Sequence, residues 1–394
     1  MLHCNGMPVP GPCCCEFHNM CHTVAACRMT ALSSVPGYGS LTTEGEHAVG
    51  AVTLDDVAGR ARVSAKTVSR VVNGERSVRP ETRQRVLRAI EQLDYRPNLL
   101  ARGLSGSHAY TIGLVYDNPN AYYILAMQQG ALAACDALNF GLQMRPCNSR
   151  SAGLAEELRD FVQRSRLSGL VLTTPVSERV AALRRLAAYH IPFVRILSAA
   201  RDPRDEFPCV YVDDRDAAYS ITRHLLQLGH ARIGFLRGGK HHHASAERLK
   251  GYKDALRDYG VPLRKELVVD GDYVFDDGFR GARRLLDLAE PPTAIFGCND
   301  EIAAGALAAA QSAGLQVPYD VSIAGFEDSP FSRHSWPPLT TARQRADVIV
   351  EHATRMLIAR IGGGEVDNEA FNPELVVRGS TAPPRSKSRR RKRR

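Results

Sequence analysis

The sequence predicts a small helical head joined to a larger α/β body that contains two doubly wound parallel sheets. Residues 52–97 hold three short segments whose apolar residues recur at helical spacing. From Tyr110 onward, runs rich in valine, isoleucine and leucine, such as residues 191–197, alternate with helical segments of roughly ten to fifteen residues, as in parallel sheets covered on both faces. The helical segments include residues 126–138, 249–259 and 346–361. About ten such runs exceed a comfortable single sheet, so we expect the body to form two subdomains.

Local signals mark the start of each predicted helix in the head. Thr53 is suited to be the N-cap of the first helix, and Asp56 can reach back to the amide of Thr53. A tight corner around Arg62 leads to Ser64, which caps the second helix, and Pro80 occupies the first position of the third. The third helix should bury one apolar stripe, formed by Val86, Leu87, Ile90 and Leu93.

The second helix has an inward face of valines and an outward face of small and basic side chains. Ala65 and Ser69 on the outward face would let the backbone approach a DNA groove closely. Lys66 and Arg70 could then donate hydrogen bonds to guanine O6 and N7. Two short helices at an angle, closed by a third, are typical of a helix-turn-helix. The alternative is a small helical bundle whose basic face is only solvated.

Three motifs in this region resemble the DNA-binding head of the lactose-repressor (LacI/GalR) family. They are V-S-x-x-T-V-S-R-V-x-N, which starts at Val63, then Y-x-P-N at Tyr95, and A-R-x-L at residues 101–104. The resemblance is close over the head and looser over the rest of the chain to about residue 380. Arg62 is a departure, because the family usually has glycine in this turn and a left-handed conformation costs arginine more than glycine.

The resemblance implies that a homodimer binds a near-palindromic operator. We expect Lys66 and Arg70 to read bases and Ala65 to fit an apolar edge such as a thymine methyl. By resemblance, the phosphate contacts come from Ser64, Thr67, Asn73, Ser77 and Thr82. Leu104, in the hinge, would enter the minor groove and bend the site; the alternative is a plain linker leucine.

The resemblance also implies that the body has the periplasmic sugar-binding fold. The expected boundaries are a disordered extension over 1–51, the head over 52–97, the hinge over 98–108, the effector-binding and dimerisation body over 109–380, and a disordered basic tail over 381–394. Within the body, one subdomain should span about 109–212 plus 342–365 and the other about 213–341 plus 366–380. No leucine-rich segment follows Thr381, which favours a dimer over the tetramer that some family members form.

The expected effector site lies at the carboxyl ends of the strands, where ligands bind in open α/β sheets. This rule points to Tyr116, Asp117, Thr174, Arg195, Arg248, Tyr273, Asn299, Glu327 and Trp336. In the family, the counterparts of Arg248, Asn299 and Glu327 hold ligand hydroxyls, and an aromatic at the position of Tyr273 often stacks on a sugar face. Glu327 is a departure, because aspartate is commoner there and the extra methylene should shift the preferred hydroxyl.

Two of these residues have structural alternatives. Arg195 interrupts an apolar strand, and a buried arginine needs a partner, so it either faces the cleft or forms a structural ion pair. Trp336, the only tryptophan, belongs either to the core or to the ligand site. Because the set mixes arginine, amide, acidic and aromatic side chains, we expect a small carbohydrate effector. A purine or another metabolite is the alternative.

Positive charge is concentrated in the head and at the end of the chain. The formal net charge of the 394 residues is +9. Residues 52–107 carry eleven basic and six acidic side chains, and the last ten residues carry eight basic and no acidic ones. The rest of the body is nearly neutral, which suits a nucleic-acid-binding head on a body that binds something else.

Motifs for catalysis, cofactors and metals are weak or missing. Residues 234–240 fit G-x-x-x-x-G-K, but His241 follows where a phosphate-binding loop needs serine or threonine. The sequence contains no G-x-S-x-G, H-E-x-x-H or G-x-G-x-x-G. The three consecutive histidines, residues 241–243, should diverge on a loop and be solvated, and the six cysteines among the first 27 residues lack zinc-ligand spacing. We therefore expect no enzymatic activity, no cofactor and no metal.

The sequence predicts a cytoplasmic, ligand-responsive transcription factor that acts as a repressor. It has no apolar run of about 18 residues and no signal-peptide core, so no membrane segment is expected. Two rivals from other classes are an architectural DNA-binding protein without an effector and a sugar-processing enzyme with an incidental head.

Overall fold

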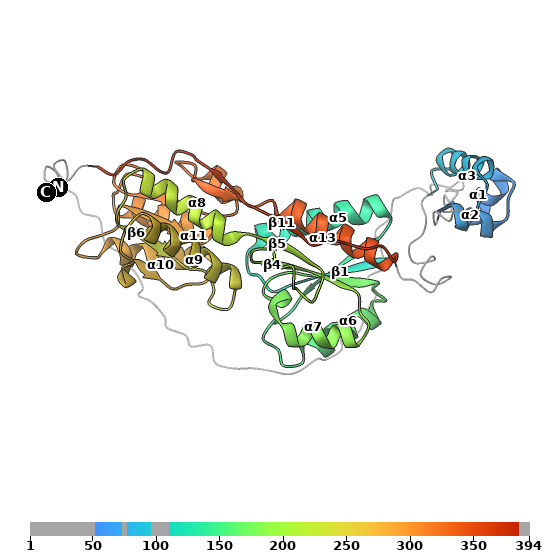
Figure 1. Ribbon diagram of the computed structural model, residues 1–394. Coiled ribbons are helices and arrows are strands. Elements are labelled where there is room, and N and C mark those ends of the chain that lie inside the picture. The colour runs from blue at the N-terminus through green and yellow to red at the C-terminus, as the bar shows by residue number, and fades with distance from the viewer. Residues whose placement is uncertain (1–51, 73–76, 96–109, 386–394) are drawn as a thin grey trace, which may run out of the picture.

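The computed structural model describes residues 52–72, 77–95 and 110–385 (Figure 1). The expected extension over 1–51, the hinge with Leu104, Asn73 and residues 386–394 lie outside the described residues. The head contains α1 (Leu54–Ala61), α2 (Ala65–Val72) and α3 (Pro80–Gln92). Val57, Val68 and Val86, one from each helix, are fully buried and form the centre of its core.

The start of α1 and the corner after it follow the local signals. The Oγ1 of Thr53 accepts a hydrogen bond from the amide of Asp56 at 3.3 Å, and the carboxylate of Asp56 accepts one from the amide of Thr53 at 2.7 Å. Arg62 adopts the left-handed conformation, with φ 51° and ψ 52°. The stripe expected on α3 was wrong at Leu87, which is 50% exposed, because Ala89 points inward beside Val86 instead.

The first subdomain is a parallel sheet with helices on both faces (Figure 1). Its strands are β1 (Thr111–Tyr116), β2 (Gly141–Pro146), β3 (Gly169–Leu172), β4 (Phe193–Ser198), β5 (Cys209–Val212) and β11 (Glu369–Phe371), in the order β11-β5-β4-β3-β1-β2. Helices α5 (Ala121–Leu138) and α13 (Ala346–Ile361) pack on one face, while α6 (Leu154–Arg164), η1 (Val176–Glu178) and α7 (Val180–Ala188) pack on the other. At Gly130, α5 approaches α13 so closely that a Cβ would lie 1.9 Å from the carbonyl oxygen of Asp347.

The second subdomain has a smaller parallel sheet with its own core. Its strands are β6 (Ile233–Leu236), β7 (Val268–Val269), β8 (Ala294–Gly297) and β9 (Ser322–Ala324), in the order β7-β6-β8-β9. Its helices are α8 (Asp214–Gln227), α9 (His243–Asp258), η2 (Lys265–Leu267), α10 (Phe275–Leu286), α11 (Asp300–Ser312) and α12 (Pro330–His334). α8 packs against α9 and α10 against α11. The two parallel sheets agree with the predicted fold class.

One expected boundary differs from the structure. We assigned residues 366–380 to the second subdomain, but β11 pairs in parallel with β5 at the edge of the first sheet. The chain then returns, because β12 (Glu374–Val376) pairs antiparallel with β10 (Thr341–Arg343). The short sequence Glu-Ala-Phe of β11 carries no apolar run, so its pairing had no signal in the pattern.

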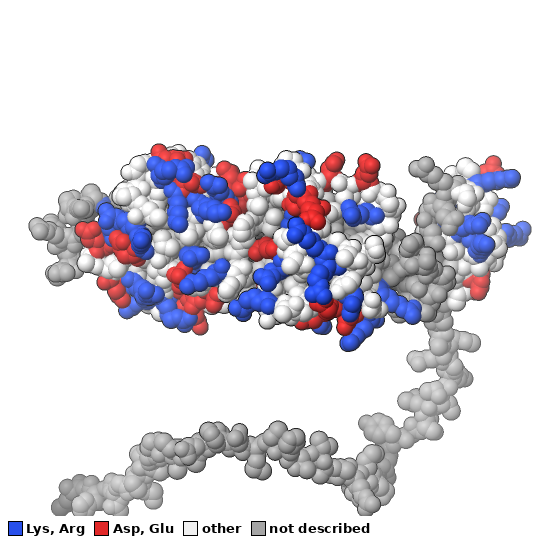
Figure 2. Space-filling view, turned by 60° about the horizontal axis from the view of Figure 1, so that its bottom comes forward, with Lys and Arg blue, Asp and Glu red and all other residues white. Residues whose placement is uncertain are grey.

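Two further features are the apolar character of the described helices and the distribution of charge on the surface of the body. None of the described helices is both long and apolar enough to cross a membrane. On the face of the body shown in Figure 2, basic and acidic side chains are interspersed over both subdomains. This agrees with the nearly neutral charge balance of the body.

Candidate effector cleft and DNA-binding face

Helix α2 presents the side chains expected to meet DNA. Lys66 and Arg70 are exposed, and Ala65 is half-buried on the same helix. The Oγ of Ser64 accepts a hydrogen bond from the amide of Thr67 at 3.2 Å, so Ser64 caps α2 as the sequence predicted. Of the other expected phosphate contacts, Ser77 is exposed and Thr82 is half-buried at the start of α3.

A cleft lies between the two subdomains, at the carboxyl ends of their strands. Its empty volume, open solvent included, is about 450 Å³. The residues that line it are Asn118, Asn120, Tyr123, Thr174, Ile196, Ser198, Val212, Asp214, His242, Ala244, Arg248, Tyr273, Glu327 and Gln344. Four of the expected effector residues are therefore brought together here: Thr174, Arg248, Tyr273 and Glu327.

Arg248 is the buried cation of this cleft. Its Nε donates to a carboxylate oxygen of Asp214 at 2.9 Å, and its Nη1 donates to the carbonyl oxygen of Cys298 at 2.6 Å. The guanidinium also lies 3.7 Å from the ring centre of Phe326. Burial disfavours the charged form, but the Asp214 carboxylate outweighs it and raises the pKa of Arg248. Arg248 is thus positively charged, and its charge is already matched by Asp214.

Glu327 lies opposite, in a strained backbone conformation with φ 111°. Its Oε2 accepts a hydrogen bond from Nδ2 of Asn120 at 3.0 Å, and its Oε1 lies 3.9 Å from Nη1 of Arg248. Burial raises the pKa of Glu327 to about 8, although Arg248 acts in the opposite direction. The bond to Asn120 joins the two subdomains, since Asn120 precedes α5 and Glu327 follows β9.

Two rings form an aromatic wall of the cleft. His242 and Tyr273 meet edge to face, with ring centres 5.1 Å apart. Burial lowers the pKa of His242, so the imidazole is neutral near pH 7. The adjacent His243 adds a second contact between the subdomains, because its Nδ1 lies 2.9 Å from the carbonyl oxygen of Ser198. We had expected the three consecutive histidines to be solvated, and for His242 this was wrong.

The structure places the other expected effector residues outside the cleft lining. Arg195 forms a buried ion pair with Asp205 and lies 5.9 Å from the ring centre of Phe207, so the structural alternative holds. Trp336 is 82% exposed and therefore belongs neither to the core nor to the cleft.

The remaining three stand close to the cleft but have structural contacts. Asn299 is fully buried and caps α11 by accepting a hydrogen bond from the amide of Ile302 at 2.8 Å. Asp117 accepts a hydrogen bond from the amide of Ser149 at 2.8 Å. Tyr116 is half-buried against the core of the first subdomain.

Several lining residues were missed in the sequence. Asn120 and Asp214 follow strands β1 and β5 by a few residues, so the strand-end rule could have found them. Ser198 is the last residue of β4, which we had ended one residue earlier. Tyr123 lies in the first turn of α5, which begins before the predicted start, and Gln344 lies in a connection that carries no sequence signal.

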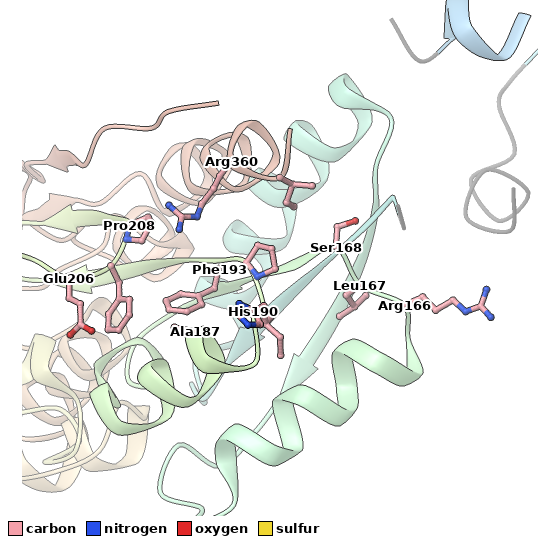
Figure 3. Close-up of a pocket in the computed structure, with 13 residues that line it drawn as sticks. Arg166, Leu167, Ser168, Ala187, His190, Phe193, Glu206, Pro208 and Arg360 are labelled. Carbon is pink, nitrogen blue, oxygen red and sulfur yellow. The ribbon is translucent and has the colours of Figure 1, made fainter. Parts of the chain in front are cut away.

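A second, larger hollow lies at the opposite edge of the first sheet. It has an empty volume of about 1560 Å³ and lies at the amino ends of β3, β4 and β5 (Figure 3). Phe193 and Pro208 face it, whereas Arg166 extends away from the other labelled side chains (Figure 3). Because ligands of open α/β sheets bind at carboxyl ends, the cleft remains the candidate effector site. No group of three or more potential ligands among the described residues is placed to hold a metal ion.

The chain is similar to known regulatory proteins over most of its length. Residues 53–98 match bacterial regulatory proteins of the lacI family, and residues 222–381 match the periplasmic binding protein-like domain. The chain is 32% identical over 320 residues to catabolite control protein A of Priestia megaterium, covering 80% of this chain and 95% of that protein. It is 33% identical to the transcriptional regulator DegA of Bacillus subtilis, covering 84% and 98%.

Solved structures agree with this relationship. The lac repressor dimer bound to operator and the anti-inducer ONPF has a TM-score of 0.67 and 26% identity, covering 84% of this chain and 99% of that one. The cellobiose complex of the regulator CelR has a TM-score of 0.62 and 29% identity over the same shares. With its helix-turn-helix head, its two-subdomain body and these relatives, the chain belongs to the LacI family of DNA-binding transcriptional regulators.

Proposed function

We propose that this protein is a dimeric repressor whose affinity for a near-palindromic operator is controlled by a neutral, polyhydroxylated effector, a small sugar, bound in the cleft. The charge balance of the cleft carries this proposal. Arg248 is matched by Asp214, His242 is neutral, and the raised pKa of Glu327 keeps much of that carboxyl protonated near pH 7. Among the described residues that line the cleft, no unmatched cation is left for an anionic ligand.

The uncharged groups that line the cleft suit sugar hydroxyls. Asn118, Thr174, Ser198 and Gln344 offer donors and acceptors of hydrogen bonds, and such groups hold hydroxyls from several directions. The ring of Tyr273 offers an apolar face for the carbon skeleton of a sugar. A similar regulator, CelR, was solved with cellobiose, which supports the same ligand class.

On the DNA side, Lys66 and Arg70 would read guanine edges, and Ala65 would contact a thymine methyl. Ser64, Thr67, Asn73, Ser77 and Thr82 would hold phosphates, and Leu104 of each subunit would enter the minor groove at the centre of the operator. The relatives that are named transcriptional repressors support repression as the outcome. The lac repressor dimer on its operator supports a dimer with two half-sites.

The cleft supplies the coupling between ligand and DNA. Residues of both subdomains line it, and Asn120–Glu327 and His243–Ser198 already join them across it. A ligand that binds one relative arrangement of the subdomains better than another shifts the population towards that arrangement. In a dimer, this changes the distance between the two heads and hence the affinity for the operator.

The test is selection of duplexes from a random pool by the full chain, followed by operator binding with single ligands. The ligands are glucose, cellobiose, ribose, hypoxanthine and guanine. A palindromic consensus whose bound fraction changes with a sugar supports the proposal, and a change only with a nucleobase rejects the sugar. Absence of any consensus rejects specific DNA binding. Thr174→Val should weaken the sugar effect, whereas Trp336→Ala, outside the cleft, should leave it unchanged.

A further inference from the structure

A third pocket adjoins the effector cleft on the side of the connection to α13. Its empty volume is about 960 Å³, and it is enclosed by the first turns of α5, the segment before α12 and the segment that leads into α13. Tyr123, Glu327 and Gln344 line both this pocket and the cleft, so the two share a wall. We propose that this pocket is a binding site for a phosphate group, distinct from the effector cleft. We call it the arginine pocket, after Arg333, Arg343 and Arg345.

Three arginines within residues 333–345 line the arginine pocket. Arg333 lies on α12, Arg343 ends β10, and Arg345 precedes α13. Gathering three guanidinium groups in one pocket has a cost, because like charges repel unless negative charge stands between them. The carboxylates of Asp328 and Asp347 offset part of this repulsion.

The arginines keep donors that the protein does not use. The side chain of Arg343 donates to Asp328 through Nε at 2.8 Å, and its terminal amino groups have no such bond in the described residues. Arg345 donates to Asp347 through Nε and Nη2 at 3.0 and 2.9 Å, which leaves Nη1. Arg333 is exposed and forms no ion pair with any described residue. A ligand in the pocket thus meets one unpaired guanidinium and two that are held in place by acids.

This donor set favours a phosphate group over a neutral ligand. A phosphate is tetrahedral, carries up to two negative charges and accepts hydrogen bonds on several oxygens, so it can engage guanidinium groups from different directions. The start of α13 adds little, since Asp347 already accepts hydrogen bonds from the first amides there. The arginines therefore carry the site. The contrast with the cleft, where the one arginine is fully matched, is what separates the two ligand classes.

The shared wall would couple the two sites. A phosphate beside Glu327 places negative charge next to a carboxyl that is already difficult to ionise, and so favours its protonated form. Protonated Glu327 can donate a hydrogen bond in the cleft, whereas the carboxylate can only accept one. This coupling rests on the proposed function of the cleft, but binding of phosphate to the arginine pocket does not.

The test is calorimetric titration of the full chain, in buffer free of phosphate, with inorganic phosphate, glucose 6-phosphate and glucose. We expect inorganic phosphate and glucose 6-phosphate to bind. Arg333→Ala should weaken both roughly tenfold or more, as for a lost charged hydrogen bond, and Arg333→Lys should restore part of the loss. Arg333 is exposed and has no ion pair among the described residues, so these variants should fold. Arg360→Ala, at an exposed arginine near the end of α13, is the matched control and should not change binding.

Three outcomes would overturn the proposal. They are no binding of either phosphate, equal loss in Arg333→Ala and Arg360→Ala, and binding of glucose 6-phosphate alone in competition with glucose. The last would make the pocket an extension of the cleft. Effector-dependent operator binding, measured on the same Arg333→Ala protein with neutral ligands, reports the cleft separately. It should persist, so failure of one proposal can be told from failure of the other.

Discussion

At the residue scale, two acids near Arg248 have different roles because they differ in their distance from its guanidinium. Asp214 is buried and bonded to Arg248, so its negative charge is directly compensated. Glu327 lies farther from the same guanidinium, at 3.9 Å, and its main polar partner is the neutral amide of Asn120. Desolvation therefore dominates at Glu327 and favours the protonated form. One acid neutralises the arginine, and the other is left free to exchange a proton or a hydrogen bond with a ligand.

The raised pKa of Glu327 has a consequence for stability. Burial, opposed by Arg248, raises the pKa of Glu327 to about 8 from its ordinary value of 4.5. The folded chain thus keeps a proton that the unfolded chain loses over this window, and the free energy of unfolding falls as pH rises from about 4.5 to about 8. Glu327→Gln, which cannot ionise, should make that fall smaller. Urea unfolding at about pH 5.5 and about pH 8.5 measures it.

Asp300 must be considered in the same experiment. Burial raises its pKa to about 7, so it contributes a fall of the same sign in both proteins. The variant should therefore retain part of the pH dependence. An unchanged difference between the two pH values would show that Glu327 is ionised at little cost in the folded chain.

Arg70 carries a prediction about DNA. Because it is exposed on the outward face of α2, Arg70→Ala should leave the fold intact and remove a base contact worth about 1–3 kcal/mol. Affinity for the selected operator should fall, while salt-sensitive binding to unrelated duplexes should change far less. Fluorescence anisotropy with both duplexes measures this, with Arg88→Ala on α3 as the control. Equal losses on both duplexes would contradict base reading by Arg70.

At the element scale, the corner between α1 and α2 contains a correctable strain. Arg62 has φ 51°, a conformation that costs most residues roughly 1–2 kcal/mol and glycine almost nothing. Arg62→Gly should stabilise the head, by about 0.5–1 kcal/mol after the entropy of the unfolded glycine is counted. Hydrogen exchange of the amides of α1 and α2 in the full chain measures the gain. Arg62→Ala removes the same side chain without the freedom of glycine and should give no gain. Equal protection in both variants would mean that the side chain, not the backbone, sets the cost.

The strands of the body were predicted from the sequence more reliably than the starts of its helices. The buried strands were predicted because parallel sheets covered on both faces leave continuous apolar runs, and α13 was predicted with its observed bounds. The starts of other helices were missed. α5 begins at Ala121 and α9 at His243, five or six residues before the predicted starts at Ala126 and Leu249. The first residues of α5, Ala-Tyr-Tyr-Ile, are apolar throughout, and those of α9, His-Ala-Ser-Ala, carry no large apolar side chain, so neither start shows helical spacing.

Only part of the site was predicted from the sequence. Arg248, Tyr273, Glu327 and Thr174 lie close to strand ends or in recognisable motifs, and the structure brings them together. Arg195 was misplaced because its partner, Asp205, lies in an irregular connection whose path the pattern does not reveal. The arginine pocket was missed because Arg333, Arg343 and Arg345 form no motif, and the pattern does not reveal that α5 from the other end of the body helps to line it.

At the scale of the whole molecule, the two subdomains share one cleft. The chain also crosses between them repeatedly. The connections before α8, between β10 and α13, and between β11 and β12 all pass from one subdomain to the other. In the cleft, the contacts Asn120–Glu327 and His243–Ser198 each join a residue of one subdomain to a residue of the other. A change in the angle between the subdomains must therefore alter these contacts. This makes them the natural points at which a ligand acts on the rest of the molecule.

Sugar binding in the cleft and operator binding by the head must influence each other equally. If a sugar in the cleft changes operator affinity by some factor, then operator must change sugar affinity by the same factor, typically roughly 5–150-fold. Calorimetry of the sugar with and without saturating operator measures one factor, and anisotropy of the operator with and without saturating sugar measures the other. Asn120→Ala removes a contact between the subdomains and should bring both factors towards one together, whereas Trp336→Ala should change neither. Unequal factors would mean that a second binding process, such as phosphate in the arginine pocket, takes part, and the cleft alone would not account for control of the head.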